Sequence, residues 1–597
     1  MKASRKASRD RQAPRLQTPR AAVKAPVKNS GTPRPVGAWR LVVAVAFLLL
    51  VTGGVAARVV MLQAEEERTF LKRQGDARTV RTLTIPSSRG VIHDRRGEPL
   101  AVSTPAASVW VNPKRFQPGH PGVVELAEAL DYSPAALESR VARFAGREFL
   151  YLRRQVSPGR AEAIAALAVP GIELEDEYKR FYPAGEVAAQ LVGITNIDDS
   201  GIEGMELAFD AWLVGSPGRK RVLRDRRGRV VRDLKYLATA EAGGDLKLSI
   251  DLRLQYLAYR ELKAAVDQYR AESGTVVVLD SWTGEVLAMV SYPSFNPNAP
   301  VTSAVGTLRN RAVTDLYEPG STVKPMTIAA ALESGRFHAG QVIDTAPGWV
   351  RVSGKLITDP LNRGELDLTQ IIARSSQVGI ARIALDLDDD LLREVFGRFG
   401  FGQTTGIGYP GETSGVLPDA ARWPLIDRVT FAFGYGLAVT PLQLAQAYSV
   451  FATGGLFRAP TLLRQTEPSP AMRVIDPVIA GHLTGMLEGV LRDEGTAVLA
   501  RVPGYPVAGK TGTVRKVGQG GYDSERHVAF FAGFAPVAEP RVTTVVVIDE
   551  PKGERIGGGQ VAAPVFSRVT AGALRLLGVP PEVPDVPVLQ ARAGGPR

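Results

Sequence analysis

Residues 318–325, with the sequence EPGSTVKP, place a serine and a lysine three positions apart at the expected start of a helix. This spacing puts the side chains of Ser321 and Lys324 on one helix face, one turn apart. A serine hydroxyl becomes an effective nucleophile when a neighbour takes its proton, and a buried lysine amine with a lowered pKa can be that neighbour. Alone the pair is a weak signal, because a capping serine beside a solvated lysine has the same spacing.

A second short motif, Ser375-Ser376-Gln377, lies in a run that is expected to be helical from Leu368 onward. The hydroxyl of Ser375 could relay a proton between Lys324, Lys510 and a leaving amine, and the Gln377 amide could hold a peptide backbone. A solvated loop or helix end explains the same residues, so this motif indicates a catalytic site only in combination with the other two motifs.

The third motif, residues 510–513 (KTGT), is expected at the edge of a strand. Its lysine and two hydroxyls, from Lys510, Thr511 and Thr513, suit a ligand that ends in a carboxylate. Gly512 allows the backbone of an extended peptide to approach closely and to pair as an additional strand. An ordinary turn is the alternative for this segment taken by itself.

Upstream of the motifs, the pattern alternates between strands and helices. Residues 82–100 combine short alternating runs with turn signals, which indicates strands and hairpins. Apolar residues recur every three or four positions at 123–130 and 135–144, which indicates helices. The small, flexible residues 241–245 mark the best internal domain boundary.

Beyond that boundary, a helix is expected from Asp251, followed by strands at 274–279 and 285–291 around a turn. A helix followed by an antiparallel hairpin is typical of a sheet that is covered by helices. The chain is therefore predicted to be a multidomain α/β protein. The expected segments are a basic, disordered tail at 1–40, a membrane anchor at 41–62, a pedestal at 63–245 that begins with a stalk, a catalytic domain at 246–580 and a flexible tail at 581–597.

One uncharged apolar segment, residues 41–57, is a candidate membrane span. At ~1.5 Å per residue it is slightly short of a ~30 Å hydrocarbon core, but Arg58 can snorkel and residues 59–62 continue the apolar run. The basic residues before the segment predict that the N-terminus stays in the cytoplasm and that the rest is exported. A signal peptide cleaved near Ala57 is the alternative.

Composition narrows the function classes. The net charge is +12, and residues 1–40 hold eleven Lys or Arg and one Asp, so this tail carries +10 and leaves +2 for the remainder. Binding of nucleic acid by the folded part therefore has little support. The absence of cysteine excludes disulfides, thiolate metal sites and a cysteine nucleophile, and five histidines make a His-rich metal site unexpected.

The three motifs in this order resemble the S-x-x-K, S-D-N and K-T-G set of class A β-lactamases and penicillin-binding proteins. From about Arg40 to Pro580 the chain is similar to the class B penicillin-binding proteins, and among them to cell-division transpeptidases of the FtsI type. Further landmarks carry the resemblance, namely RGVIxDR at 89–95, KRFYP at 179–183, GIEGxE at 201–206, AESG at 271–274, FGYGL at 433–437 and AGFAP at 532–536.

The resemblance implies a membrane anchor, an elongated pedestal and a transpeptidase domain with an antiparallel sheet flanked by helices. It implies that Ser321 is the nucleophile, that Lys324 is its base, and that Ser375 and Lys510 relay protons. It also implies that the substrate is bound by Gln377, Thr511, Gly512 and Thr513. The backbone N–H groups of Ser321 and Thr513 would form the oxyanion hole. One departure is Gln377, where the family usually has Asn. His93 and His527 are expected to be turn or rim residues.

The activity implied is that of a peptidoglycan D,D-transpeptidase, which cross-links stem peptides of nascent glycan made from lipid II at the division septum. β-Lactams would acylate it, and neither a cofactor nor a metal is expected. The implied location is the inner membrane with the catalytic domain in the periplasm, beside an FtsW-type glycosyltransferase and other divisome proteins. The same motifs also serve hydrolases, meaning D,D-carboxypeptidases or β-lactamases, and a non-catalytic scaffold or β-lactam sensor is a third alternative.

Overall fold

The computed structural model describes residues 37–61, 79–225, 230–299, 305–419, 423–518 and 520–582. The predicted tail up to residue 36, the predicted stalk from residue 63 to residue 78 and the C-terminal residues 583–597 lie outside the described residues. The chain divides into two units, one of residues 1–81 with 222–232 and the other of residues 82–221 with 233–597.

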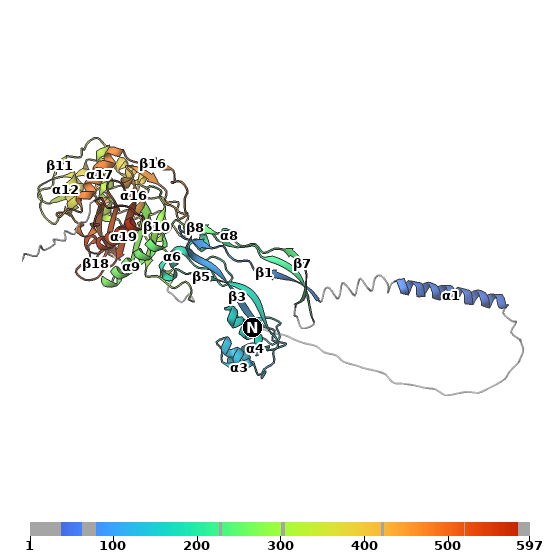
Figure 1. Ribbon diagram of the computed structural model, residues 1–597. Helices are drawn as coiled ribbons and strands as arrows, with labels where there is room; N and C mark the ends of the chain where they lie inside the picture. The colour runs from blue at the N-terminus through green and yellow to red at the C-terminus, as the bar shows by residue number, and fades with distance from the viewer. Residues whose placement is uncertain are drawn as a thin grey trace, which may run out of the picture. The chain divides into compact units, whose positions relative to one another are not determined.

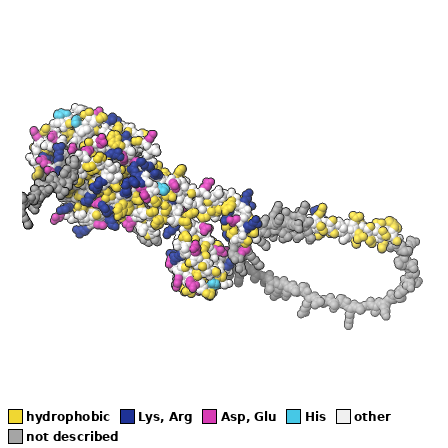
Figure 2. Space-filling view, viewed as in Figure 1, with side chains coloured by type: hydrophobic (Ala, Val, Ile, Leu, Met, Phe, Trp, Pro, Cys, Tyr) yellow, Lys and Arg dark blue, Asp and Glu magenta, His cyan; other side chains and the backbone are white. Residues whose placement is uncertain are grey.

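In the first unit, the apolar segment forms the helix α1 (Ala38–Met61), drawn in blue in Figure 1. All of its residues are exposed, and hydrophobic side chains cover much of its visible face (Figure 2). A helix of a soluble domain would place an apolar stripe against a core, and α1 has no buried residue. Among the described residues, α1 is the one helix long and apolar enough to cross a membrane.

The second unit contains an extended antiparallel strand, β3 (Pro99–Val111), which pairs with β4 (Leu150–Val156) and with β5 (Ile172–Phe181). Three helices pack against these strands around a core of their own that includes Leu126 and Leu137. They are α3 (Val123–Ala129), α4 (Pro134–Arg143) and α5 (Pro158–Ala166). The predicted helices at 123–130 and 135–144 are confirmed, because their apolar spacing faces this core.

A buried cluster of charged side chains connects β5 to segments that precede β3 and follow β5 in the sequence. Glu206 is fully buried and accepts hydrogen bonds from the guanidinium groups of Arg89 at 2.6 Å and Arg180 at 2.6 Å. Arg89 also donates to the backbone oxygen of Glu206 at 2.8 Å and to Asp210 at 2.7 Å. The cluster links residues that are far apart in the sequence, so it fixes the packing of three separate segments.

Replacing Glu206 with alanine is expected to lower the free energy of unfolding by about 3–5 kcal/mol, because two buried guanidinium groups lose their counter-charge. Urea denaturation of the full chain in detergent measures the change, with Glu98→Ala, an exposed acid of the same region, as the control. A loss below about 1 kcal/mol, the range of surface ion pairs, would contradict a structural role for the cluster.

The region that contains the first and third motifs is built on one antiparallel sheet in the order β10-β9-β19-β18-β17. The strands are β9 (Ser273–Asp280), β10 (Val286–Tyr292), β17 (Ala508–Gly518), β18 (Gly521–Ala535) and β19 (Val542–Asp549). The predicted hairpin of two strands after residue 273 is confirmed. Because β17 ends the order, it is an edge strand, as expected for residues 510–513.

Helices cover both faces of the sheet, since the central strands β9 and β19 are buried at every position. The helices α9 (Leu252–Gln268) and α19 (Ala563–Leu576) pack on each other and on the sheet, and α16 (Pro441–Ala452) also contacts its central strands (Figure 1). Asp251 caps α9 by accepting from the Arg253 N–H at 3.0 Å. The predicted class, an α/β protein with an antiparallel sheet flanked by helices, is confirmed.

Candidate active site

The structure brings the three motifs together at the β17 edge of the sheet. Ser321 lies in a short 3-10 turn, Gly320–Val323, that leads into the helix α11 (Lys324–Glu333). This turn packs against β17, and a Cβ atom added at Gly512 would lie 2.9 Å from Thr322 Cγ2. Glycine at 512 therefore lets the strand approach the serine turn closely.

The amine of Lys324 connects the first motif to the second. It is fully buried and donates to the backbone oxygen of Ser375 at 2.7 Å, the Ser375 hydroxyl at 3.1 Å and the backbone oxygen of Ser376 at 3.3 Å. Burial lowers the pKa of Lys324 to about 7, against an opposing effect of the Asp359 carboxylate. A substantial neutral fraction at neutral pH makes this amine able to accept a proton.

Lys510 is a second buried amine in the same site. It is fully buried on β17, and its amine donates to the backbone oxygen of Thr511 at 3.3 Å and to the Thr511 hydroxyl at 3.4 Å. Burial, and then repulsion from Lys324, lowers the pKa of Lys510 well below its ordinary value. Two amines that repel each other in a desolvated site favour a state in which they do not both carry a proton.

Ser375 lies at a break between two helices rather than inside one. The helix α12 (Leu368–Arg374) ends there, and α13 (Gln377–Leu385) begins two residues later with Ser376 as its N-cap. Ser375 has φ 56° and ψ 41°, a left-handed conformation that is uncommon for a residue other than glycine. This backbone turn directs both the carbonyl and the hydroxyl of Ser375 at Lys324. The helical run expected from Leu368 is present, and Ser375 lies at its end, as the alternative for this motif allowed.

Asp359, which the sequence analysis missed, holds this break in place. Its carboxylate accepts hydrogen bonds from the Ser376 hydroxyl at 2.5 Å, the Gln377 N–H at 2.6 Å and the Val378 N–H at 3.2 Å. The loop that carries Asp359 follows the strand β13 (Lys355–Thr358) and resembles no motif, so no local signal distinguishes it. A carboxylate at a helix N-terminus is stabilised by the free N–H groups there.

Replacing Asp359 with asparagine is expected to shift the pH profile of acylation to lower pH, because the carboxylate raises the pKa of Lys324 and its loss lets that pKa fall further. Loss of the charged cap should also lower the free energy of unfolding by about 1–2 kcal/mol. Acylation rates with a fluorescent penicillin between pH 5 and 9 measure the shift. Asp344→Asn, a change at an exposed carboxylate at the end of the strand β11 (Val342–Asp344), is the control. An inflection that stays or moves upward in the Asp359→Asn variant would contradict this role.

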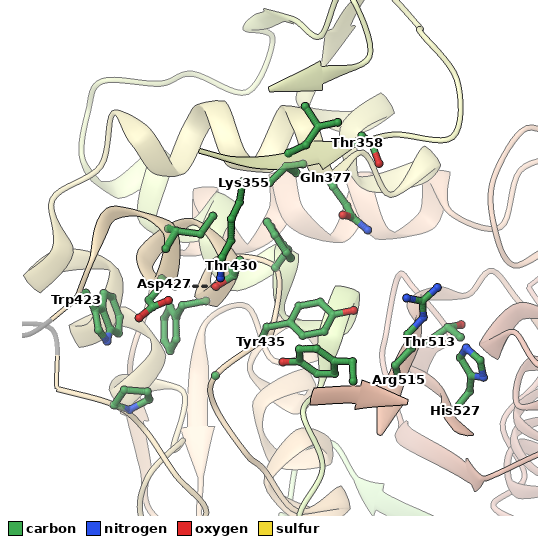
Figure 3. A pocket seen from close by; sticks show the side chains of 18 residues that line it. Lys355, Thr358, Gln377, Trp423, Asp427, Thr430, Tyr435, Thr513, Arg515 and His527 are labelled. Carbon is green, nitrogen blue, oxygen red and sulfur yellow. Dashed lines mark hydrogen bonds between the residues drawn. The ribbon is translucent and has the colours of Figure 1, made fainter. Parts of the chain in front are cut away.

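A cavity of about 960 Å³ opens beside these residues. Gln377 and Thr513, two of the predicted substrate-binding residues, line it from opposite sides, and Arg515 and His527 lie next to Thr513 (Figure 3). Aromatic rings, including that of Tyr435, form another part of the wall. His527 lines this cavity, as expected for a residue at the rim of the site.

The hydroxyls of the third motif have protein partners. The Thr511 hydroxyl lies 3.0 Å from that of Thr496, and the Thr513 hydroxyl accepts from the Gly558 N–H at 3.0 Å. Within the described ranges, no group of three or more His, Asp or Glu side chains is placed to hold a metal ion. The functional groups that the site brings together are hydroxyls and buried amines, which suit chemistry at a carbonyl group.

Two family models match the chain, the penicillin-binding protein transpeptidase domain at residues 274–571 and the penicillin-binding protein dimerisation domain at residues 84–248. The chain belongs to the penicillin-binding proteins that combine these two domains, the class B proteins of the FtsI type.

Among curated relatives, the peptidoglycan D,D-transpeptidase FtsI of Escherichia coli is 42% identical over 91% of this chain and 93% of its own length. The probable peptidoglycan D,D-transpeptidase PbpC of Pseudomonas aeruginosa is 42% identical over 93% of this chain and 98% of its own length. Penicillin-binding protein 3 of Mycobacterium tuberculosis, solved in complex with aztreonam, is 26% identical, covers 84% of this chain and 99% of that chain, and superposes with a TM-score of 0.65.

Proposed function

We propose that the protein is a peptidoglycan D,D-transpeptidase that works through an acyl-enzyme on Ser321. The observation that carries the proposal is the buried amine of Lys324, which hydrogen-bonds Ser375 and lies one helical turn from Ser321. A desolvated amine of this kind can take the hydroxyl proton that serine must lose in order to attack. The curated relatives named as D,D-transpeptidases support the choice of reaction.

In the first half-reaction, the Ser321 hydroxyl gives its proton to Lys324 while its oxygen attacks the carbonyl carbon of the penultimate D-Ala of a pentapeptide stem. The backbone N–H groups of Ser321 and Thr513 stabilise the oxyanion. Removal of one such donor typically lowers the reaction rate ~10²–10³-fold. Ser375 and Lys510 relay the proton to the nitrogen of the terminal D-Ala, which leaves as the C–N bond breaks. Serine is then esterified by the stem.

In the second half-reaction, the side-chain amine of another stem attacks the ester carbonyl. The new amide bond forms as the C–O bond to Ser321 breaks, and the serine oxygen regains a proton through Lys324. Before the first half-reaction, Thr511 and Thr513 bind the carboxylate of the donor's terminal D-Ala, Gln377 holds the donor's peptide backbone, and Gly512 lets the donor pair along the edge strand β17. β-Lactams imitate the donor and leave Ser321 acylated.

The products separate this activity from the alternatives. With soluble pentapeptide stems and an acceptor amine, mass spectrometry is expected to detect cross-linked dimers together with one free D-Ala for each cross-link. Tetrapeptides without dimers, or rapid turnover of penicillin, would assign the chain to the hydrolases. A chain that released no D-Ala, and whose Ser321→Ala variant still supported growth of a depleted strain, would be a scaffold.

The proposed domain organisation keeps the predicted segments: a tail at 1–40, an anchor at 41–62, a pedestal at 63–245, a transpeptidase domain at 246–580 and a tail at 581–597. The helix α1 anchors the chain in the inner membrane, with its N-terminus in the cytoplasm and the catalytic domain in the periplasm at the septum. Lipid II-derived glycan, an FtsW-type glycosyltransferase and other divisome proteins are the proposed partners. Membrane fractionation tests the anchor, and a soluble mature protein that begins near Arg58 would contradict it.

A further inference from the structure

Glu318 lies three residues before the serine nucleophile, in the segment that leads into the 3-10 turn Gly320–Val323. Its backbone is fixed on both sides, because Tyr317 forms a bridge with Val439 and the Gly320 N–H donates to the Gly434 oxygen at 3.1 Å. The carboxylate is half-buried, and one of its oxygens, Oε2, is fully buried without a hydrogen-bond partner. Burial raises the pKa of Glu318.

No cation neutralises this carboxylate among the described residues. The adjoining cavity of about 610 Å³ is lined by Arg515 and by three further cationic side chains, Arg309, Arg311 and Lys516, which are paired with other carboxylates. Arg311 contacts Asp315 at 2.8 Å, and Lys516 contacts Asp549 at 3.1 Å. Partial burial of a carboxylate without an ion pair costs free energy, and hydrogen bonds from specific donors can offset this cost.

The partners of Glu318 are two groups of the active-site wall. Its Oε1 atom accepts hydrogen bonds from the Gly436 N–H at 2.8 Å and from the Tyr522 hydroxyl at 3.0 Å. Tyr522 belongs to the β17–β18 hairpin, whereas Gly436 lies in the loop before α16. One oxygen therefore ties two separate loops to the turn that carries Ser321.

These loops supply a row of aromatic rings along the large cavity. The Tyr522 ring meets Tyr435 edge-on with centroids 5.4 Å apart, and Tyr435 meets Phe433 edge-on at 5.8 Å. All three residues line the cavity that Gln377 and Thr513 also line, and the Tyr435 ring points into it (Figure 3). Tyr522 is 49% exposed and follows Gly521 at the end of its hairpin, so packing alone restrains it weakly.

We propose that Glu318 is a positioning residue that holds this aromatic row, Phe433, Tyr435 and Tyr522, at a fixed place beside Ser321. The inference rests on the proposed function, because the row then contacts the part of the acyl donor that lies beyond the reacting carbonyl. Glu318 acts through Tyr522 and Gly436 and does not itself touch the reacting atoms. Its loss therefore affects donors with a large side group and spares donors without one.

Acylation by two β-lactams tests the proposal with the full chain in detergent. Benzylpenicillin carries a large acylamino side group, and 6-aminopenicillanic acid lacks it. Glu318→Ala is expected to lower the second-order acylation constant for benzylpenicillin about tenfold, the effect of one lost charge-assisted hydrogen bond, and that for 6-aminopenicillanic acid less than about twofold. Glu333→Ala, an acid at the end of α11 paired with Arg398, is the matched control and should change neither.

Two further variants separate positioning from general destabilisation. Glu318→Gln keeps an oxygen that accepts from both Gly436 and Tyr522, so it should restore benzylpenicillin acylation to within about threefold of the parent. Tyr522→Phe keeps the ring and removes only the hydroxyl, so it should reproduce the selective loss, and combining it with Glu318→Ala should add little. Tyr522→Phe also keeps the test decisive if Glu318→Ala does not fold.

Equal losses for both β-lactams, no loss for benzylpenicillin, or a glutamine variant as slow as the alanine variant would overturn the proposal. The ratio of the two constants reports on acylation alone, whether an amine or water later resolves the ester. Failure of the proposed function would instead be seen in the parent protein, as acylation that does not occur at Ser321.

Discussion

Replacing Ser321 with alanine is expected to abolish covalent labelling by a fluorescent penicillin and to abolish formation of cross-linked stem peptides. The Ser321 oxygen is the atom that forms the ester. It lies in a turn that packs against β17, one helical turn from the buried amine of Lys324. Losing the nucleophile of a serine acyltransferase costs on the order of 10⁶-fold in rate. Intact-mass measurement and gel fluorescence detect the loss.

The matched control is Ser334→Ala, at the C-cap of the same helix α11, where the hydroxyl donates to the Ala331 oxygen at 2.6 Å and accepts from the Arg336 N–H at 3.1 Å. It should label as fully as the parent. Thermal unfolding of both variants shows that the fold is kept. Full labelling of Ser321→Ala would remove the basis for the assigned chemistry, even if the three motifs lie together.

The second large effect concerns the protonation state of Lys324. Its pKa is lowered from the ordinary lysine value to about 7 by burial, so the neutral, proton-accepting form is present above that pH and is lost as the pH falls. The acylation rate of the parent is expected to fall about tenfold per pH unit below about pH 7 and to level off above it. Stopped-flow measurement with a chromogenic β-lactam between pH 5 and 9 records the profile.

Arginine at 324 remains charged throughout this range, so Lys324→Arg should lose ~10²–10⁴ in acylation rate at every pH. Lys263→Arg, on the exposed face of α9, is the control and should keep the parent's profile. A flat profile across pH 7, or an arginine variant with more than about a tenth of the parent's rate, would exclude Lys324 as the base.

Features that depend on short spacings could be predicted from the sequence. The i, i+3 spacing of Ser321 and Lys324 predicted that both lie at the start of a helix, and the pattern after Asp251 predicted the helix α9. The strand hairpin of β9 and β10 followed from two short apolar runs around a turn. Each of these features is decided by the residue pattern of one continuous segment.

Features that depend on tertiary packing could not be predicted. The left-handed conformation of Ser375 breaks a run whose residues favour helix, and Asp359, sixteen positions earlier in the chain, stabilises the break. Nothing in the spacing of either segment indicates that they meet. Likewise Gly512 was expected to make room for a substrate, and the structure adds that its missing side chain makes room for Thr322.

Roles assigned to Gln377, Thr511 and Thr513 stay predictions, because they concern contacts with a bound donor. The structure provides their surroundings: Gln377 faces the cavity from the start of α13, and the two threonine hydroxyls are oriented by Thr496 and Gly558. Orientation by a second residue is what a carboxylate-binding hydroxyl needs. Sequence spacing alone would not have identified either partner.

The central claim is that one hydroxyl, activated by a neutral amine, carries the acyl group. Peptide mapping by mass spectrometry, after the full chain has reacted with benzylpenicillin, locates that group on a single residue. The account predicts one adduct per chain, on the peptide that contains Ser321 and on the Ser321 oxygen itself. An adduct on Ser375, on Lys324 or on Lys510, or a chain that remains unmodified, would contradict it.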